Sequence, residues 1–209
     1  MFTKTLSRSA QNSLAILGKS GLLKDGYLAG GSALALHLGH RYSLDFDFFT
    51  PRSFDAKQLT LKLGKLGNFK KETIKSDTIV GEFNKVKFSF FYFPYPLVKK
   101  LGRFLNLQLA DPADIGAMKI AAIVDRGTKR DFIDLYFLIK EKYQIEEILK
   151  FYNKKYQKLS ENIYSIIKSL KYFEDAEESE MPRMIKKISW EEIKRFFESE
   201  AVRLGKKYL

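Results

Sequence analysis

The sequence contains no cysteine and only two histidines, His37 and His40. A chain of this composition can form neither a disulfide framework nor a thiolate metal site, and two histidines alone cannot build a zinc centre. Long hydrophobic runs are also absent, because the most apolar stretch, VKFSFFYFPYPLV, is shorter than the roughly 20 residues needed to span a bilayer. The N-terminus lacks the apolar segment of a signal peptide. We therefore expect a soluble, cytoplasmic protein with no membrane partner.

Positive charge, by contrast, is abundant. The 209 residues carry a formal net charge of +12, and 45% of them are hydrophobic. This apolar content is sufficient for a globular core, and the length suits one sizeable domain with an appendage. A strong excess of positive charge concentrates anions around a protein, so nucleic acid or nucleotide phosphate is a candidate partner. The alternative is that the lysines only solvate the surface.

Two kinds of pattern divide the chain. The first part combines amphipathic helices, expected at 8–20 and 55–66, with short apolar strands and an alternating segment, ETIKSDTIVGEFNKVKFSFFYF, that is typical of antiparallel strands. Further along, apolar positions recur with helical spacing. We predict an α/β (α+β) fold with a mixed sheet flanked by helices. The predicted core spans 1–108, and a helical region over 109–209 packs on that core and completes its active site.

The run YSLDFDFFTP places two acidic residues in an otherwise apolar strand. Asp45 and Asp47 are two apart, so they share one face with their roots about 6–7 Å apart, while Leu44, Phe46 and Phe48 are expected to face the core. Like charges this close repel each other unless a cation lies between them. Mg²⁺ or Mn²⁺ bound by the carboxylate oxygens would remove that cost. The alternative is that both acids point to solvent or pair with nearby cations.

A Gly-Gly-Ser turn precedes these acids. Gly30, Gly31 and Ser32 join a short apolar strand to the predicted helix SALALHLGH. Bare backbone N–H groups at a helix N-terminus suit phosphate oxygens. The alternative is an ordinary connection in which Ser32 is the N-cap of the helix. Arg41 and Ser43 follow that helix and are further candidates for contact with phosphate.

Twelve residues separate Gly31-Ser32 from the run Asp45-Phe46-Asp47-Phe48. This order and spacing resemble the signature of polymerase-beta-like nucleotidyltransferases. The later block ADPADIGAMKIAAIVDRGTKRDFIDLYFLI, taken with GGSALAL and HRYSLDFDFF, is similar to the AbiEii/AbiGii nucleotidyltransferase toxin family. The resemblance runs from about residue 26 to 140 and implies a polymerase-beta-like nucleotidyltransferase fold.

The resemblance also implies residue roles. In that family the Gly-Gly-Ser turn and the paired acids form the nucleotide and metal site, a later lysine contacts the phosphates, and a later aspartate is needed for activity. These map here to Lys119 and to Asp134, with Asp131 as the alternative. The two aspartates are three apart on a predicted helix, so they share a face and repel unless a cation lies opposite. Lys119 lies in an apolar helix, where it would either extend outward or face a cleft.

One position departs from the polymerase-beta-like pattern, which commonly carries a third metal-binding carboxylate on a later strand. The candidate strand NKVKFSFFYF has Ser89 at that place. Either Asp134 or Asp131 completes the metal shell, or the site holds one metal weakly.

The resemblance therefore implies a Mg²⁺-dependent enzyme that transfers a nucleoside monophosphate from an NTP to an acceptor hydroxyl. It implies RNA, in particular the 3′ end of tRNA, as the acceptor, and a role as the toxin of a toxin–antitoxin or abortive-infection system with a cognate antitoxin encoded nearby. Two alternatives remain open from the residues: transfer to a small molecule or a protein, and a nucleotide- or RNA-binding module whose catalysis is weak.

Overall fold

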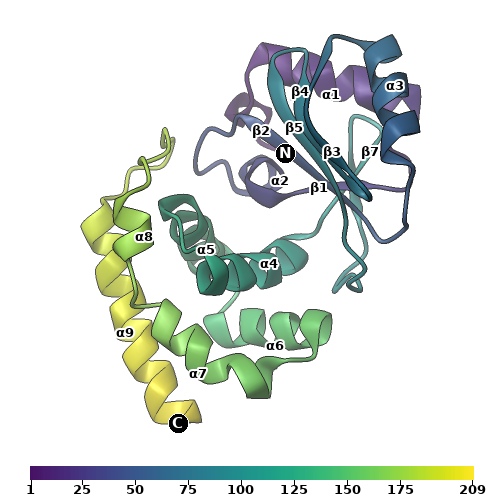
Figure 1. Ribbon diagram of the computed structural model, residues 1–209. Helices are drawn as coiled ribbons and strands as arrows, with labels where there is room; N and C mark the ends of the chain where they lie inside the picture. Colours follow the sequence, from purple (N-terminus) through teal and green to yellow (C-terminus); the bar gives the residue numbers. More distant parts are fainter. The chain divides into compact units, whose positions relative to one another are not determined.

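Two units divide the chain in the computed structural model, which describes residues 1–209. Met1–Asp111 contains a seven-stranded sheet, and Pro112–Leu209 is helical. Figure 1 shows the helices and strands of both units. None of the helices combines the length and the apolar composition that a membrane crossing requires.

The sheet of the first unit is mixed, as the sequence predicts. Its strand order is β3-β4-β5-β2-β1-β7-β6. The central strand β2 pairs antiparallel with β1 and parallel with β5, whereas β3, β4 and β5 form an antiparallel meander. The strands are β1 Tyr27–Ala29, β2 Asp45–Thr50, β3 Phe69–Lys75, β4 Thr78–Phe83, β5 Val86–Tyr92, β6 Gly102–Phe104 and β7 Leu107–Leu109.

The helices of this unit are η1 Thr3–Thr5, α1 Arg8–Ser20, α2 Gly30–Leu38 and α3 Ala56–Leu66. Both predicted amphipathic helices are confirmed, and their ends follow local signals. The Ser7 and Asp55 side chains accept hydrogen bonds from the first turns of α1 and α3, and α1 ends at Gly21, whose φ is 64°. Such caps satisfy backbone groups that a helix end leaves without partners. Figure 1 shows α1 and α3 on the same side of the sheet.

Alternate residues of β2 and β5 face opposite sides of the sheet. Phe46 and Phe48 are fully buried, and Phe90 lines one pocket together with Leu22 and with Leu59 of α3, so this set faces the helices. Asp45, Asp47 and Phe49 are half-buried on the other face. The expectation that Leu44 faces the core is wrong. Leu44 precedes the strand and is 69% exposed, since the strand alternation begins only at Asp45.

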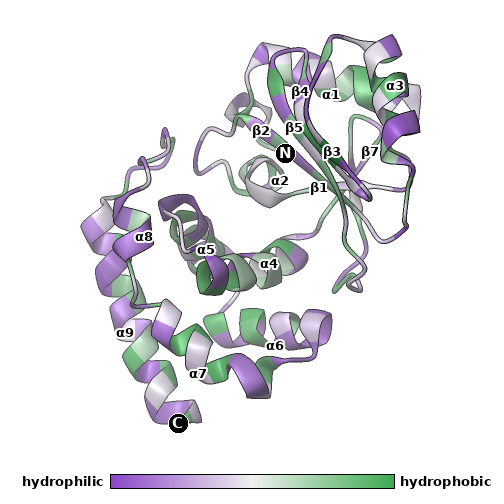
Figure 2. Cartoon of the chain, viewed as in Figure 1, coloured by the Kyte–Doolittle hydropathy of each residue, from purple (hydrophilic) through white to green (hydrophobic).

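The second unit consists of α4 Pro112–Asp125, α5 Lys129–Glu141, α6 Ile145–Tyr156, α7 Leu159–Ser169, α8 Glu174–Glu177 and α9 Trp190–Tyr208. The predicted helical character of this part is therefore confirmed. Figure 2 shows hydrophilic and hydrophobic residues in stripes along α9, as expected for an amphipathic helix. Its apolar residues Ile193, Phe197 and Leu204 are fully buried. Phe197 packs against Phe132 of α5, with ring centroids 5.3 Å apart.

Two local features differ from expectation. Residues 102–109 form a hairpin, β6–β7, that the strand patterns do not reveal. Its turn residues Leu105 and Asn106 both have positive φ, 49° and 64°, a conformation that glycine or asparagine signals and leucine does not. The second feature is the short helix α8, Glu174–Glu177, which no periodic pattern predicts.

Candidate functional site

The Gly-Gly-Ser turn forms the start of α2 directly after β1. The helix begins at Gly30, and no side chain caps it. The alternative in which Ser32 is the N-cap is therefore wrong, because Ser32 is already the third helical residue. Its buried hydroxyl lies within hydrogen-bonding distance of the Asp45 backbone carbonyl and 2.9 Å from the Ser43 hydroxyl. Ser32 thus connects the turn to the beginning of β2 through its side chain. The first N–H groups of α2 have no side-chain cap.

Both glycines allow close approach of a charged side chain. Gly30 has φ 62°, and a Cβ atom there would lie 2.6 Å from Oδ2 of Asp47. A Cβ at Gly31 would lie 2.2 Å from a guanidinium nitrogen of Arg41, which is buried. The turn therefore brings bare backbone N–H groups, one guanidinium and one carboxylate together. Such a set can hold phosphate oxygens on one side and a metal ion on the other.

The paired acids lie beside this turn on β2. Ala29, the last residue of β1, pairs with Asp47. The turn that comes after Ala29 therefore lies beside the half of β2 that carries Asp45 and Asp47. On the opposite neighbour β5, Ser89 pairs with Asp47 and donates a hydrogen bond of 2.7 Å to Oδ1 of that carboxylate. One Asp47 oxygen is thereby fixed by Ser89, and the other is directed toward Gly30.

The donor chemistry of these acids fits a hard divalent cation. Carboxylate oxygens are the ligands that Mg²⁺ takes in proteins, usually one or two of them with substrate phosphates and water completing the octahedron. No group of three or more His, Cys, Asp or Glu side chains that could hold a metal ion is present. Two carboxylates beside a glycine turn match the smaller set that Mg²⁺ uses with a nucleotide.

The later candidates lie in the second unit. Lys119 of α4 is buried, and its Nζ atom lies 2.9 Å from Oδ1 of Asp131 and 2.7 Å from Oδ2 of Asp134. Lys119 is therefore the cation that the two aspartates on one helix face require, and it does not extend outward to solvent. Asp131 also accepts a hydrogen bond of 2.7 Å from the Thr128 hydroxyl in a capping box at the start of α5. Burial raises the pKa of Asp131, but Lys119 and Thr128 outweigh it and hold the pKa below its ordinary value.

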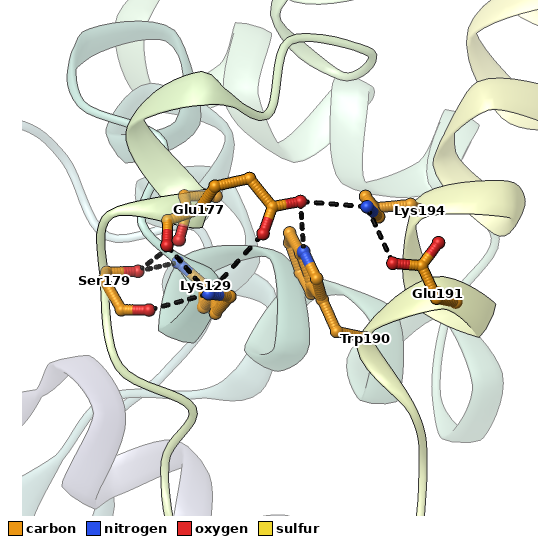
Figure 3. Close-up of polar contacts among 7 residues, drawn as sticks. Lys129, Glu177, Ser179, Trp190, Glu191 and Lys194 are labelled. Carbon is orange, nitrogen blue, oxygen red and sulfur yellow. Dashed lines mark hydrogen bonds and ion pairs between the residues drawn. The ribbon is translucent and has the colours of Figure 1, made fainter.

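A further cluster fixes the start of α5, and sequence reasoning missed it (Figure 3). The first backbone N–H of that helix, on Lys129, donates to the Ser179 hydroxyl at 2.9 Å, and the Lys129 ammonium donates to the carbonyls of Glu177 and Ser179. The Glu177 carboxylate then accepts hydrogen bonds from Trp190 and Lys194 of α9, both at 2.9 Å. Glu177, at the end of α8, and Ser179 therefore connect α5 to α9 through hydrogen bonds. Lys129 and Ser179 are fifty residues apart in the sequence, so no local pattern could show that Ser179 binds the start of α5.

The structure thus places the predicted residues in two groups. The first unit brings together the turn, the basic residue and the paired acids: Gly30, Gly31, Ser32, Arg41, Ser43, Asp45 and Asp47. The second unit brings together Lys119, Asp131 and Asp134.

A glycine turn at a helix start beside paired acids on the next strand, within a mixed sheet, defines a nucleotidyltransferase fold. Solved structures support this class. MenT4, a nucleotidyltransferase toxin from Mycobacterium tuberculosis, matches with a TM-score of 0.57 and 14% identity, over 95% of this chain and 86% of that one. JHP933 from Helicobacter pylori matches with a TM-score of 0.56 and 19% identity, over 97% and 94% of the two chains.

The chain belongs to the AbiEii family of nucleotidyltransferase toxins of type IV toxin–antitoxin systems, whose model matches residues 14–203. An uncharacterised protein of Aquifex aeolicus is 38% identical over 199 residues, which are 93% of this chain and 95% of the relative. The family membership that the paired motifs predict is confirmed. The protein is therefore a nucleotidyltransferase and a toxin, with an antitoxin as counterpart.

Proposed function

We propose that this toxin transfers a nucleoside monophosphate from an NTP to a hydroxyl group of RNA, at the 3′ end of tRNA. The observation that carries the proposal is the contact set around Asp47, where Gly30 approaches one carboxylate oxygen and Ser89 binds the other. The charge supports an RNA acceptor. The net charge is +12, and in residues 1–111 basic residues outnumber acidic ones by roughly two to one, which favours a polyanion.

The residues of the first unit have distinct roles in this proposal. The backbone N–H groups of the turn and the Arg41 guanidinium hold the triphosphate tail. Asp45 and Asp47 hold Mg²⁺, which supplies charge neutralisation and polarisation of the phosphoryl oxygens when bound. The acceptor hydroxyl oxygen bonds to the α-phosphorus as the bond to the bridging oxygen of pyrophosphate breaks, and the hydroxyl proton passes to a carboxylate or to water. Ser89 keeps Asp47 in one orientation throughout.

The residues of the second unit enter through the family resemblance. Lys119 is assigned to neutralise charge on the leaving pyrophosphate, and Asp134, with Asp131 as the alternative, to assist the metal or to activate the acceptor hydroxyl. Their mutual ion pairing supports this assignment, because two carboxylates within 2.9 Å hold the lysine side chain in one position.

Incubation of the protein with each labelled NTP, Mg²⁺ and total tRNA tests the proposal. We expect the label to appear in tRNA for at least one NTP. Asp45→Asn and Asp47→Asn should each abolish the transfer. Glu72→Gln is the matched control, because Glu72 is an exposed acid on β3. Label found in a small molecule or in protein would show that the acceptor is not RNA. Transfer by Asp45→Asn at the wild-type rate would overturn the assigned metal site.

A second candidate rests on Ser89. The hydroxyl stands opposite Asp47, where a third carboxylate is expected in polymerase-beta-like enzymes. A serine in place of this carboxylate favours a module that binds a nucleotide and catalyses transfer weakly. Nucleotide binding by equilibrium dialysis without label in any acceptor would support this candidate over the transferase.

A further inference from the structure

Four aromatic side chains gather beside the paired acids in the first unit. We call them the aromatic tier, and its members are Phe49, Phe91, Phe93 and Tyr95. The ring centroid of Phe49 lies 5.8 Å from that of Phe91 and 5.2 Å from that of Phe93. The rings of Phe93 and Tyr95 lie 4.9 Å apart. The tier begins on β2 and β5 and continues into the segment after β5.

The tier lies on the sheet face that carries the paired acids. Phe49 is two residues beyond Asp47 on β2, and Phe91 is two beyond Ser89 on β5, so each lies on the same face one step further along. The step corresponds to about 6–7 Å. Direct pairing of Phe49 with Phe91 and of Asp47 with Ser89 confirms that these are successive rows of one surface.

Phe49 stacks on the buried Tyr27, with ring centroids 6.1 Å apart, so the tier extends outward from the core. Phe46, Phe48 and Phe90 face the helix side of the sheet, whereas Phe49 and Phe91 on the opposite face stay half-buried. Tyr95 at the end of the tier is 41% exposed. A group of aromatic rings that keeps part of its surface accessible next to a charged site is a feature of recognition surfaces. Aromatic faces of this kind stack nucleic acid bases.

The geometry of phosphoryl transfer decides whether the aromatic tier faces the base of the NTP or the base of the RNA acceptor. The glycine turn lies beside the half of β2 that carries Asp45 and Asp47, and Ser32 contacts the Asp45 carbonyl. In the proposed function the triphosphate tail is therefore held at that end. In-line displacement places the attacking hydroxyl opposite the leaving pyrophosphate. The acceptor therefore approaches from the other end of β2, which is the Phe49 end.

We propose that the aromatic tier stacks the terminal base of the RNA acceptor and so positions its hydroxyl at the paired acids. This inference rests on the proposed function, in which RNA is the acceptor. Stacking on rings is tolerant of base identity, since every base offers an aromatic face. The tier thus selects a single-stranded end, and a base paired within a duplex is not available to it.

Two measurements on the full-length protein test the tier: binding of total tRNA without NTP, and KM values for tRNA and NTP in the transfer assay. We expect Tyr95→Leu and Phe91→Leu to weaken tRNA binding and to raise the KM for tRNA by about 5- to 100-fold, the usual range for loss of one stacked base. The KM for NTP should stay unchanged. Tyr95→Phe should behave as wild type, because it keeps the ring.

Tyr92→Leu is the matched control. Tyr92 has the same 41% exposure as Tyr95, but its position in β5 alternates with Phe91, so it belongs to the opposite face. Unchanged tRNA binding by Tyr95→Leu and Phe91→Leu would overturn the proposal. A rise in the KM for NTP alone would also overturn it and assign the tier to the donor base. If the wild type labels no RNA, the proposed function fails, while the binding measurement without NTP still decides the tier.

Discussion

Ser89 and Asp47 are joined across two parallel strands by a hydrogen bond of 2.7 Å from the serine hydroxyl to Oδ1 of the carboxylate. The bond fixes the rotation of the Asp47 side chain and directs Oδ2 toward Gly30. A carboxylate in place of Ser89 would instead repel Asp47 until a cation bound. The serine therefore preorganises the acid before any ligand arrives.

This orientation predicts that Ser89→Ala lowers the transfer rate by about tenfold. A hydrogen bond to a charged group contributes about 1.5–3 kcal/mol, and its loss lets Asp47 rotate. Label transfer at saturating NTP and a Mg²⁺ titration measure the effect. Thr73→Ala is the control, because Thr73 lies further along the same row on β3. A rate equal to that of wild type would mean that other contacts orient Asp47.

The close approach at Gly30 predicts a second outcome. Gly30→Ala should abolish transfer, because its Cβ would press on the Asp47 carboxylate and the residue would be held at φ 62°. Gly64→Ala in α3 is the matched control. A Cβ at Gly64 meets nothing within 4 Å, so alanine there should keep activity and stabilise the protein by about 0.4–1 kcal/mol. Transfer rates and urea midpoints measure both variants, and an active Gly30→Ala would contradict the assigned turn.

The helical unit contains a fully buried ion pair between Asp114 of α4 and Lys155 of α6, with Nζ 2.8 Å from Oδ1. Asp114→Asn should destabilise this unit by about 3–5 kcal/mol, because it leaves a buried ammonium without its charge partner. The double variant Asp114→Leu/Lys155→Met should recover most of that loss. Urea unfolding followed by fluorescence of Trp190, the single tryptophan of the chain, reports on this unit. Additive losses in the double variant would show that the two charges are not coupled.

The contact between α6 and α9 predicts a pH dependence. Hydrogen bonds from Arg203 and Lys207 lower the pKa of Glu146 from 4.5 to about 2. A lowered pKa stabilises the folded state above the ordinary value, and this stabilisation is lost as the pH falls from 4.5 to about 2. Because Arg203 is partly exposed, the contribution is at most about 1 kcal/mol.

Glu146→Gln should therefore lower the urea midpoint at neutral pH and change it much less at pH 2, where the wild-type carboxyl, with a pKa of about 2, is about half protonated and most of the stabilisation is lost. Glu161→Gln is the control, since Glu161 is exposed on α7. An equal loss of stability at both pH values would show that Glu146 acts through packing and not through its charge.

The periodic parts of this fold follow from the sequence. The strand alternation at Asp45–Thr50 and the helical spacing after Pro112 predict the elements found there. Periodicity reflects only which side of an element is buried, so it holds where one side faces a core. Leu44 shows the limit, because it precedes the strand and does not share the alternation.

Contacts between distant residues do not follow from local patterns. The signal of a serine after two glycines favours a cap, but Ser32 binds the Asp45 carbonyl thirteen residues later. Lys119 in an apolar helix is compatible with an outward or an inward position, and only Asp131 and Asp134 decide between them. The β6–β7 hairpin was missed because Leu105 adopts a positive φ that its side chain does not predict.

The hydrogen bond from the first N–H group of α5 to the Ser179 hydroxyl affects how the helical unit unfolds. Asp131 and Asp134 belong to a helix whose first N–H group is satisfied by Ser179, in a segment whose neighbours Met181 and Ile185 are exposed. We expect local opening of that segment to remove this hydrogen bond, while the capping box of Thr128 and Asp131 still closes the start of α5. The amide hydrogen in the contact between Ser179 and α5 should therefore exchange faster than those of the buried helices of the unit do.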